Sequence, residues 1–145
     1  ATARVLTAAG FAVVACDDRP GTLTPEWVPG VYDRRLVDYK NLSELCPIGP
    51  RDLVVVATAG HKSDIDVVIQ AMRARPAYLG CLGSRRKTAF VRARLEQEGF
   101  TQEQIDELHL PIGVAIEAED PEEIAISIAA EMIHLRRTKL VPRKR

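Results

Sequence analysis

The chain has 145 residues, of which 46% are hydrophobic, 28% are charged and 5% are aromatic, and its formal net charge is +0. This composition is ordinary for one compact globular domain. Zero net charge and few aromatic residues argue against nucleic acid or a membrane surface as the partner, and no apolar run approaches the ~20 residues that a membrane-spanning helix needs. The three cysteines show no CxxC spacing, which argues against a disulfide framework or a structural zinc site and favours a cytoplasmic location.

The first half of the chain predicts a helix, a strand and a long loop. Residues 1–10 are helix formers that end in glycine, a common helix stop, and FAVVAC follows as a short apolar strand. Residues 20–50 are rich in Pro and Gly, which predicts a loop around a short extended piece and a short helix near 41–45. We expect Trp27 and Tyr32 to anchor this loop.

The second half of the chain alternates strands and helices. The expected elements are strands at 52–58 and 77–83, and helices at about 63–75, at 85–97, after Thr101 and after Asp120. Ser63 or Asp64 is the expected N-cap of the first of these helices. The last helix carries Pro121 at its first position and Glu123 at its third, an arrangement typical of a capping box.

Strands that are apolar throughout and alternate with helices predict an α/β fold in which helices cover both faces of the sheet. We therefore expect a single Rossmann-like domain over residues 1–145, with a doubly wound, mostly parallel sheet. Because the chain lacks an initiator Met and opens inside an expected helix, we expect its first strand and glycine-rich loop to lie upstream, in a longer protein.

The turn at residues 80–87, GCLGSRRK, combines two glycines with three adjacent cations. Glycine lets a backbone approach a ligand closely, and a helix that begins at Ser84 would point free N–H groups outward. Arg85, Arg86 and Lys87 beside these groups predict a site for a phosphate or another anion. The turn is not a P-loop, because GxxxxGK[ST] is absent, and a solvated helix face is the alternative.

Polar residues also follow the two other predicted strands. Asp17, Asp18 and Arg19 come after FAVVAC. In dinucleotide-binding folds an acid at such a place, ~20 residues past a glycine loop, holds a ribose hydroxyl, and a solvated turn is the alternative. His61 and Asp64 could bind a metal or move protons, but a loop histidine and a helix cap are the favoured interpretation, so no metal site is predicted.

Cys81 lies between the two glycines of the turn. It could be a reactive thiol or a sulfur carrier. A small buried side chain on a central strand is the favoured interpretation.

Three blocks, taken in order, resemble the C-terminal domain of the XdhC/CoxI family: TAGHKSDIDVVIQAM, AYLGCLGSRRKTAFVRARLEQEGF and PIGVAIEAEDPEEIAISIAAEMI. The start, LTAAGFAVVACDDRP, is similar to the stretch after that domain's glycine loop, so the resemblance covers nearly the whole chain. Members of this family are accessory proteins for xanthine dehydrogenase and related molybdenum hydroxylases. The resemblance implies a protein that binds the molybdenum cofactor, promotes its sulfuration with a cysteine desulfurase and delivers it to the apo-hydroxylase. It also implies a unit similar to NAD(P)-binding domains, so NAD(P) is a second candidate ligand, and we expect a homo-oligomer.

The resemblance also implies which residues bind the cofactor. Residues 83–87 match the family's glycine-serine-basic motif, and we place the cofactor's phosphate there, on backbone N–H groups and a guanidinium. His61 and Asp64 match the family's histidine and aspartate after the preceding strand. Asp18 and Arg19 match its acidic-basic pair. The candidate cofactor-binding residues are Asp18, Arg19, His61, Asp64, Gly80, Gly83, Ser84, Arg85, Arg86 and Lys87.

One loop departs from the family pattern. The family commonly reads GLDIGA where residues 113–118 read GVAIEA, so an acid is lost at Ala115 and Glu117 replaces a glycine. A carboxylate at this position would repel an anionic ligand and needs more room than glycine. Any contact of this loop with a ligand is therefore in doubt here.

Three functions stay open. A cofactor-binding maturation factor is favoured over a catalyst, because it explains the matched blocks and needs no catalytic set within the chain. An NAD(P)-dependent oxidoreductase explains Asp17 and Asp18 equally well, but no acid-base pair for a substrate can be assembled from the sequence. The third is a structural domain that supports the missing part of the protein or a dimer interface. Ile126 and Ile133 permit it, because they are apolar residues outside the main apolar stripe of the last helix.

Overall fold

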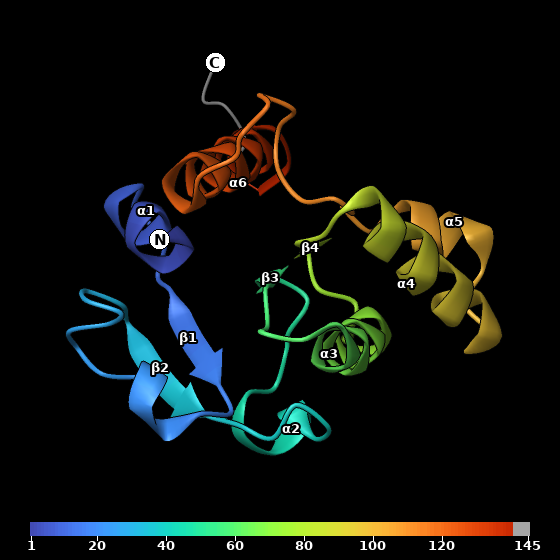
Figure 1. Ribbon diagram of the computed structural model, residues 1–145, viewed down its shortest axis with the longest axis horizontal. Coiled ribbons are helices and arrows are strands. Elements are labelled where there is room, and N and C mark those ends of the chain that lie inside the picture. The colour runs from blue at the N-terminus through green and yellow to red at the C-terminus, as the bar shows by residue number, and fades with distance from the viewer. Residues whose placement is uncertain (141–145) are drawn as a thin grey trace. The chain divides into compact units, whose positions relative to one another are not determined.

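The computed structural model describes residues 1–140, except for the side chain of His61. The chain divides into two compact units: unit 1 comprises Ala1–Leu36 and Gly113–Arg145, and unit 2 comprises Val37–Ile112. Each unit combines helices with a pair of parallel strands (Figure 1), so the predicted α/β class is confirmed. Within residues 1–140, no helix has the length and apolar character that crossing a membrane requires.

Unit 1 is built from a strand pair and two main helices. Its elements are α1 (Thr2–Ala8), β1 (Val14–Asp17), η1 (Pro20–Thr22), β2 (Asp33–Leu36), α6 (Pro121–Leu135) and η2 (Arg136–Leu140). The strand predicted from residue 11 begins only at Val14, and β2 is the predicted extended piece of the loop. Helices α1 and α6 pack against each other, and their shared core contains Leu6, Ala125, Ile128 and Met132.

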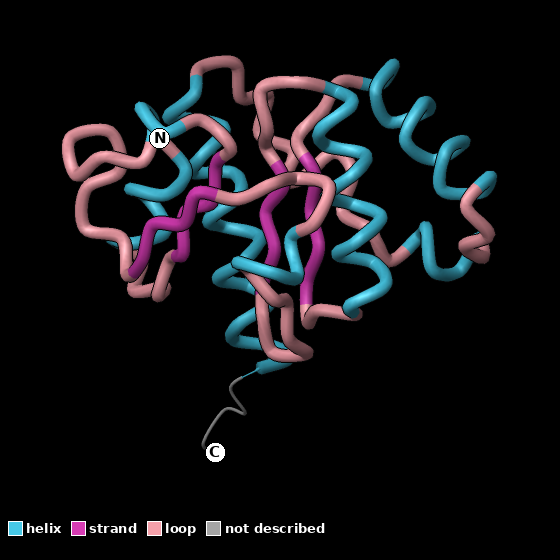
Figure 2. Tube along the Cα trace, turned by 90° about the horizontal axis from the view of Figure 1, so that it is seen from below, coloured by secondary structure: helices cyan, strands magenta, loops and turns pink. Residues whose placement is uncertain are grey.

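Unit 2 carries the other strand pair, and its helices follow the strands. Its elements are α2 (Leu42–Leu45), β3 (Leu53–Val56), α3 (His61–Ala74), β4 (Tyr78–Cys81), α4 (Arg85–Gln97) and α5 (Gln102–Asp106). Strands β3 and β4 run side by side in parallel, as the magenta tubes of Figure 2 show, and Val56 lies opposite Cys81. Helix α3 packs against both strands, α4 packs against α3, and α5 packs against α4. Residues with no exposed surface fill this core: Val68, Cys81, Val91, Leu95 and Ile105.

Two helix starts follow from side chains next to the first turn. Helix α4 begins at Arg85 as predicted, and the Ser84 hydroxyl caps it by accepting a hydrogen bond from the Lys87 backbone N–H at 3.3 Å. The Glu123 carboxylate accepts from the Asp120 N–H at 3.2 Å, and Pro121 occupies the first turn of α6. Both starts are therefore determined by local sequence.

The predicted start of α3 is wrong. The helix begins at His61, and its N-cap is Gly60 in an extended conformation, so neither Ser63 nor Asp64 caps it. Asp64 lies in the first turn of α3 and is only 1% exposed. Its carboxylate is used for a contact with another element, which local sequence does not indicate.

The expected anchoring of the β1–β2 loop by aromatic residues is also wrong. Trp27 and Tyr32 are 75% and 78% exposed. Hydrogen bonds to backbone carbonyls hold the loop instead: the Tyr32 N–H donates to the Val13 carbonyl at 2.8 Å, and the Arg34 guanidinium donates to the Val28 carbonyl at 2.6 Å.

Candidate functional site

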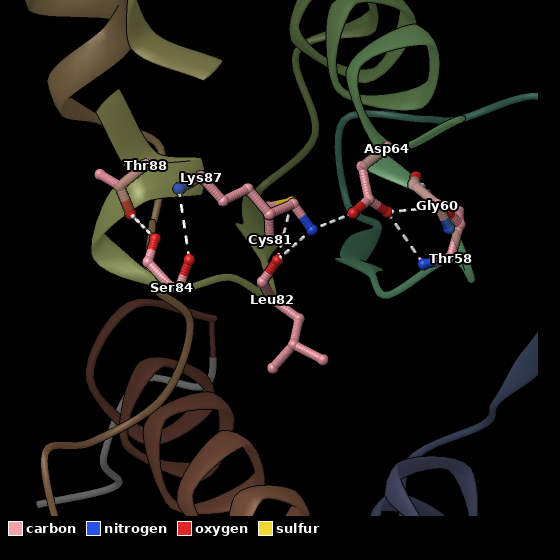
Figure 3. A network of polar contacts seen from close by, with 8 residues as sticks. All are labelled: Thr58, Gly60, Asp64, Cys81, Leu82, Ser84, Lys87 and Thr88. Atoms are coloured by element: carbon pink, nitrogen blue, oxygen red, sulfur yellow. Dashed lines mark hydrogen bonds and ion pairs between the residues drawn. The ribbon is translucent and has the colours of Figure 1, made fainter. Parts of the chain in front are cut away.

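A buried ion pair links the turns that follow β3 and β4 in unit 2 (Figure 3). The Lys87 ammonium group, from α4, contacts the Asp64 carboxylate, from α3. The side chains of Lys87 and Asp64 are only 9% and 1% exposed. The same ammonium donates to the Leu82 carbonyl oxygen at 2.5 Å. The structure thus brings together two predicted site residues that are far apart in the sequence.

Thr58 completes the environment of the Asp64 carboxylate. Its backbone N–H donates to Asp64 Oδ1 at 2.9 Å, and its hydroxyl lies 2.7 Å from the same oxygen. This hydroxyl is also 2.9 Å from the Gly60 carbonyl oxygen. The sequence analysis gave Thr58 no role. A threonine at the end of a strand, followed by an acid in the first turn of the next helix, is a pattern that could have indicated this contact. The buried carboxylate is therefore satisfied by protein donors on both oxygens.

Both glycines of the GCLG turn have a packing role. A Cβ atom on Gly83 would lie 2.7 Å from Lys87 Cδ, so the lysine stem occupies the space that a larger residue would need. A Cβ atom on Gly80 would lie 2.5 Å from Ile112 Cδ1 and 2.6 Å from the Tyr78 hydroxyl. Close packing alone accounts for glycine at both positions, and a ligand contact at either stays a prediction.

Two arginines and a pocket lie at the start of α4. Arg85 and Arg86 are exposed, unlike Lys87. A pocket of about 320 Å³ is lined by Ser84, Arg86, Lys87 and Phe90. Phe90 is 54% exposed and was not predicted as a site residue, although its position four residues after Arg86 puts both on one helix face. This surface offers cationic donors next to an aromatic ring.

The structure agrees with the favoured interpretation of Cys81 as a small buried side chain. It has no exposed surface, and burial raises the pKa of its thiol to about 11, with the nearby Asp64 carboxylate adding to the rise and Lys87 opposing it. A thiol in this state is protonated at neutral pH, which argues against a reactive thiol or sulfur carrier at this position.

Two candidates, Asp18 and Arg19, belong to unit 1. Arg19 forms a two-pronged ion pair with Asp17, with distances of 3.0 Å from Nε to Oδ1 and from Nη2 to Oδ2. The side-chain hydrogen bonds from Arg19 hold the pKa of the Asp17 carboxyl below its ordinary value. Asp18 is exposed after the end of β1. His61 is the first residue of α3, and its side chain lies outside the described part of the structure.

The loop at residues 113–118 has two residues in the left-handed backbone region. Gly113 has φ = 97°, and a Cβ atom there would lie 2.2 Å from Ser127 Oγ. Glu117 has φ = 56°, a conformation that costs an L-residue free energy and that glycine adopts readily. This is the position at which the family pattern carries glycine.

Comparisons with known proteins identify a family and several relatives. A family model described as the XdhC Rossmann domain matches residues 1–132. The chain is 32% identical over 128 residues to the uncharacterized protein YqeB of Escherichia coli, covering 88% of this chain and 23% of YqeB. It is 28% identical over 105 residues to the molybdenum cofactor insertion chaperone PaoD of E. coli, covering 72% of this chain and 33% of PaoD. It is 31% identical over 130 residues to a protein of Bacillus subtilis named as a probable subunit of xanthine dehydrogenase, covering 88% of this chain and 37% of that protein.

A solved structure is similar over nearly the whole chain. A crystal structure described as a xanthine dehydrogenase from Bacillus halodurans superposes with a TM-score of 0.80 at 28% identity, covering 97% of this chain and 41% of that one. Together with the family model, this similarity confirms the predicted Rossmann-like fold. The chain spans well under half the length of each of these relatives.

Proposed function

The chain belongs to the XdhC family through its Rossmann domain, and from this we propose that it binds the molybdenum cofactor and assists its insertion into an apo molybdenum hydroxylase such as xanthine dehydrogenase. The names of two relatives support this role, since one is a molybdenum cofactor insertion chaperone and the other is a probable part of xanthine dehydrogenase. The cofactor supplies the molybdenum chemistry of the hydroxylase. In this proposal the chain acts as a maturation factor, whose own work is to hold the cofactor and to release it to its partner.

The observation that carries the proposal is the exposed cationic surface at the start of α4. Arg85 and Arg86 stand at the N-terminus of a helix of 13 residues, where backbone N–H groups and the helix dipole favour an anion. A guanidinium group can hold a phosphate through two parallel hydrogen bonds. These donors suit the cofactor's phosphate. The adjacent pocket, with Arg86 and Phe90 in its lining, offers an aromatic ring for a flat heterocycle.

We extend the proposal to cofactor sulfuration with a cysteine desulfurase. The chain's own contribution to this step is binding rather than sulfur transfer, since the Cys81 thiol is buried and its pKa is raised to about 11. The sulfur would then come from the desulfurase, while this chain holds the cofactor during the reaction.

An NAD(P)-binding oxidoreductase is the second candidate function. The observation in its favour is the exposed carboxylate of Asp18 directly after β1, at the strand end where Rossmann folds hold a ribose hydroxyl. This candidate predicts saturable nicotinamide binding that weakens in Asp18→Ala.

Calorimetric titration of the full-length protein tests both functions. Separate titrations with molybdenum cofactor, NAD(H) and NADP(H) should give binding for the molybdenum cofactor and no signal for the nicotinamides. Arg85→Ala combined with Arg86→Ala should weaken cofactor binding by about 1 to 3 kcal/mol, the value of charge-assisted hydrogen bonds. Arg51→Ala combined with Arg137→Ala removes the same charge from other exposed positions and should leave binding unchanged. Nicotinamide binding without cofactor binding would replace the first function by the second.

A further inference from the structure

We infer that Lys87 is a positioning residue of the cofactor site, which holds the turn before α4 in place so that Arg85 and Arg86 make the contact with the anion. The five residues of the motif at 83–87 would then divide into a structural part and a binding part. This inference rests on the proposed function and deepens it, because it names which cations of the site meet the ligand.

The Lys87 ammonium group already has its partners within the protein. Its ammonium group contacts Asp64, and the side chains of both residues are at least nine-tenths buried. If Lys87 turned toward a ligand, the Asp64 carboxylate would stay buried without its cation, which is strongly disfavoured. The donors from Thr58 would remain, but they carry no full charge. Lys87 is therefore not available to a ligand without breaking the site.

The same side chain holds the turn that carries the arginines. The Lys87 ammonium donates to the Leu82 carbonyl at 2.5 Å, and its backbone N–H donates to the Ser84 hydroxyl at 3.3 Å. Its stem passes so close to Gly83 that a Cβ atom there would lie 2.7 Å from Lys87 Cδ. This one lysine thus bonds Leu82 and Ser84 on the two sides of Gly83, as Figure 3 shows for Leu82 and Ser84.

The ion pair also connects this turn to the end of the neighbouring strand. Asp64 accepts the Thr58 backbone N–H, just after β3, while Lys87 bonds the Leu82 carbonyl, just after β4. In an α/β fold, ligands bind beyond these carboxyl ends of the strands. Arg85 and Arg86 are the two exposed cations of the motif, so their direction depends on a turn that the pair holds.

A double-variant experiment separates positioning from ligand contact. The variants are Lys87→Met, which keeps the stem and removes the charge, Asp64→Asn, which keeps an acceptor for Thr58, and the two combined. Lys62→Met, on an exposed lysine of α3, is the control. Each is examined for its thermal midpoint, for hydrogen exchange of the amides at 82–88, and for calorimetric binding of molybdenum cofactor in the full-length protein.

Each single variant should lower the thermal midpoint, speed exchange at 82–88 and weaken cofactor binding by about tenfold, within the coupling range of neighbouring residues. The combined variant should recover the midpoint, because no unpaired charge stays buried, but its exchange at 82–88 should stay fast and its binding weak, because the Lys87 bond to the Leu82 carbonyl is lost. The Arg85→Ala and Arg86→Ala combination should weaken binding while it keeps the midpoint and the slow exchange. Lys62→Met should behave as the unaltered protein.

Two results would overturn the inference. Weakened cofactor binding in Lys87→Met while exchange at 82–88 stays slow would make Lys87 a ligand residue. Exchange at 82–88 that stays slow in Lys87→Met, or is slow in the combined variant, would show that the pair does not hold the turn. Absence of cofactor binding by the unaltered protein would instead reject the proposed function, and the exchange data would still decide whether Lys87 positions the turn.

Discussion

At the scale of single residues, the environment of a side chain decides whether it can react. Cys81 lies between the glycines of the GCLG turn, a setting that could expose a thiol to a ligand, yet it has no exposed surface. Burial removes water from the charged form, so the pKa of the thiol is raised to about 11. The residue acts as a small apolar side chain in the core of unit 2.

Alkylation of the native protein checks this assignment. A raised pKa means that the Cys81 thiolate forms only as the pH approaches about 11, so iodoacetamide at pH 8 should leave Cys81 unmodified. The half-buried Cys16 and Cys46 should react faster, and all three should react after denaturation. Peptide mass spectrometry gives the rate at each site. A Cys81 rate at pH 8 equal to that of the other two would contradict the assignment.

Glu117 shows the opposite case, a residue whose backbone conformation suits another amino acid. Because its φ of 56° favours glycine, Glu117→Gly should raise the free energy of unfolding by about 0.5 to 1 kcal/mol. Glu117→Ala removes the same carboxylate but keeps the Cβ atom, so it should give no gain. Urea unfolding measures both. An equal gain in the two variants would point to charge repulsion instead of backbone strain.

At the scale of elements, glycine in β4 sets how closely the neighbouring segment can pack. Gly80 is buried in the middle of the strand, and its backbone pairs with that of His109. The space next to its Cα atom is filled by the Ile112 side chain and the Tyr78 hydroxyl. The strand can therefore accept the segment around residues 109–112 only without a side chain at position 80.

Gly80→Ala should lower the free energy of unfolding by about 1 to 3 kcal/mol, the usual cost of overpacking a core. The reason is the 2.5 Å approach of the added Cβ atom to Ile112 Cδ1. Gly21→Ala is the matched control, since nothing lies within 4 Å of its Cβ position. Urea unfolding of both variants decides the matter. A Gly80→Ala protein as stable as the control would refute the packing role.

Elements whose signals are local could be predicted from the sequence. The starts of α4 and α6 followed from Ser84 and from Glu123, because each cap lies within three residues of the groups it bonds. The start of α3 could not be predicted, because Asp64 bonds Lys87, a residue on another helix. The turn at 80–87 was identified as a candidate site from its glycines and cations. The Lys87 side chain is buried whereas Arg85 and Arg86 are exposed. This difference depends on the contact between Lys87 and Asp64, which no local sequence pattern contains.

At the scale of the whole molecule, the chain matches only part of each protein to which it is similar. It spans between 23% and 41% of the relatives to which it is similar. The proposed partner is a molybdenum hydroxylase, and the proposed cargo is its cofactor. In this view the arginines of α4 hold the cofactor's phosphate until the partner takes it over, so affinity and transfer should depend on the same two side chains.

The measurement that tests this account most directly is cofactor transfer to cofactor-free xanthine dehydrogenase. The full-length protein, loaded with molybdenum cofactor, should restore the activity of the dehydrogenase faster than free cofactor at the same concentration. Arg85→Ala combined with Arg86→Ala should reduce the rate to that of free cofactor, while its thermal midpoint stays unchanged. A loaded protein that restores activity no faster than free cofactor would contradict the account.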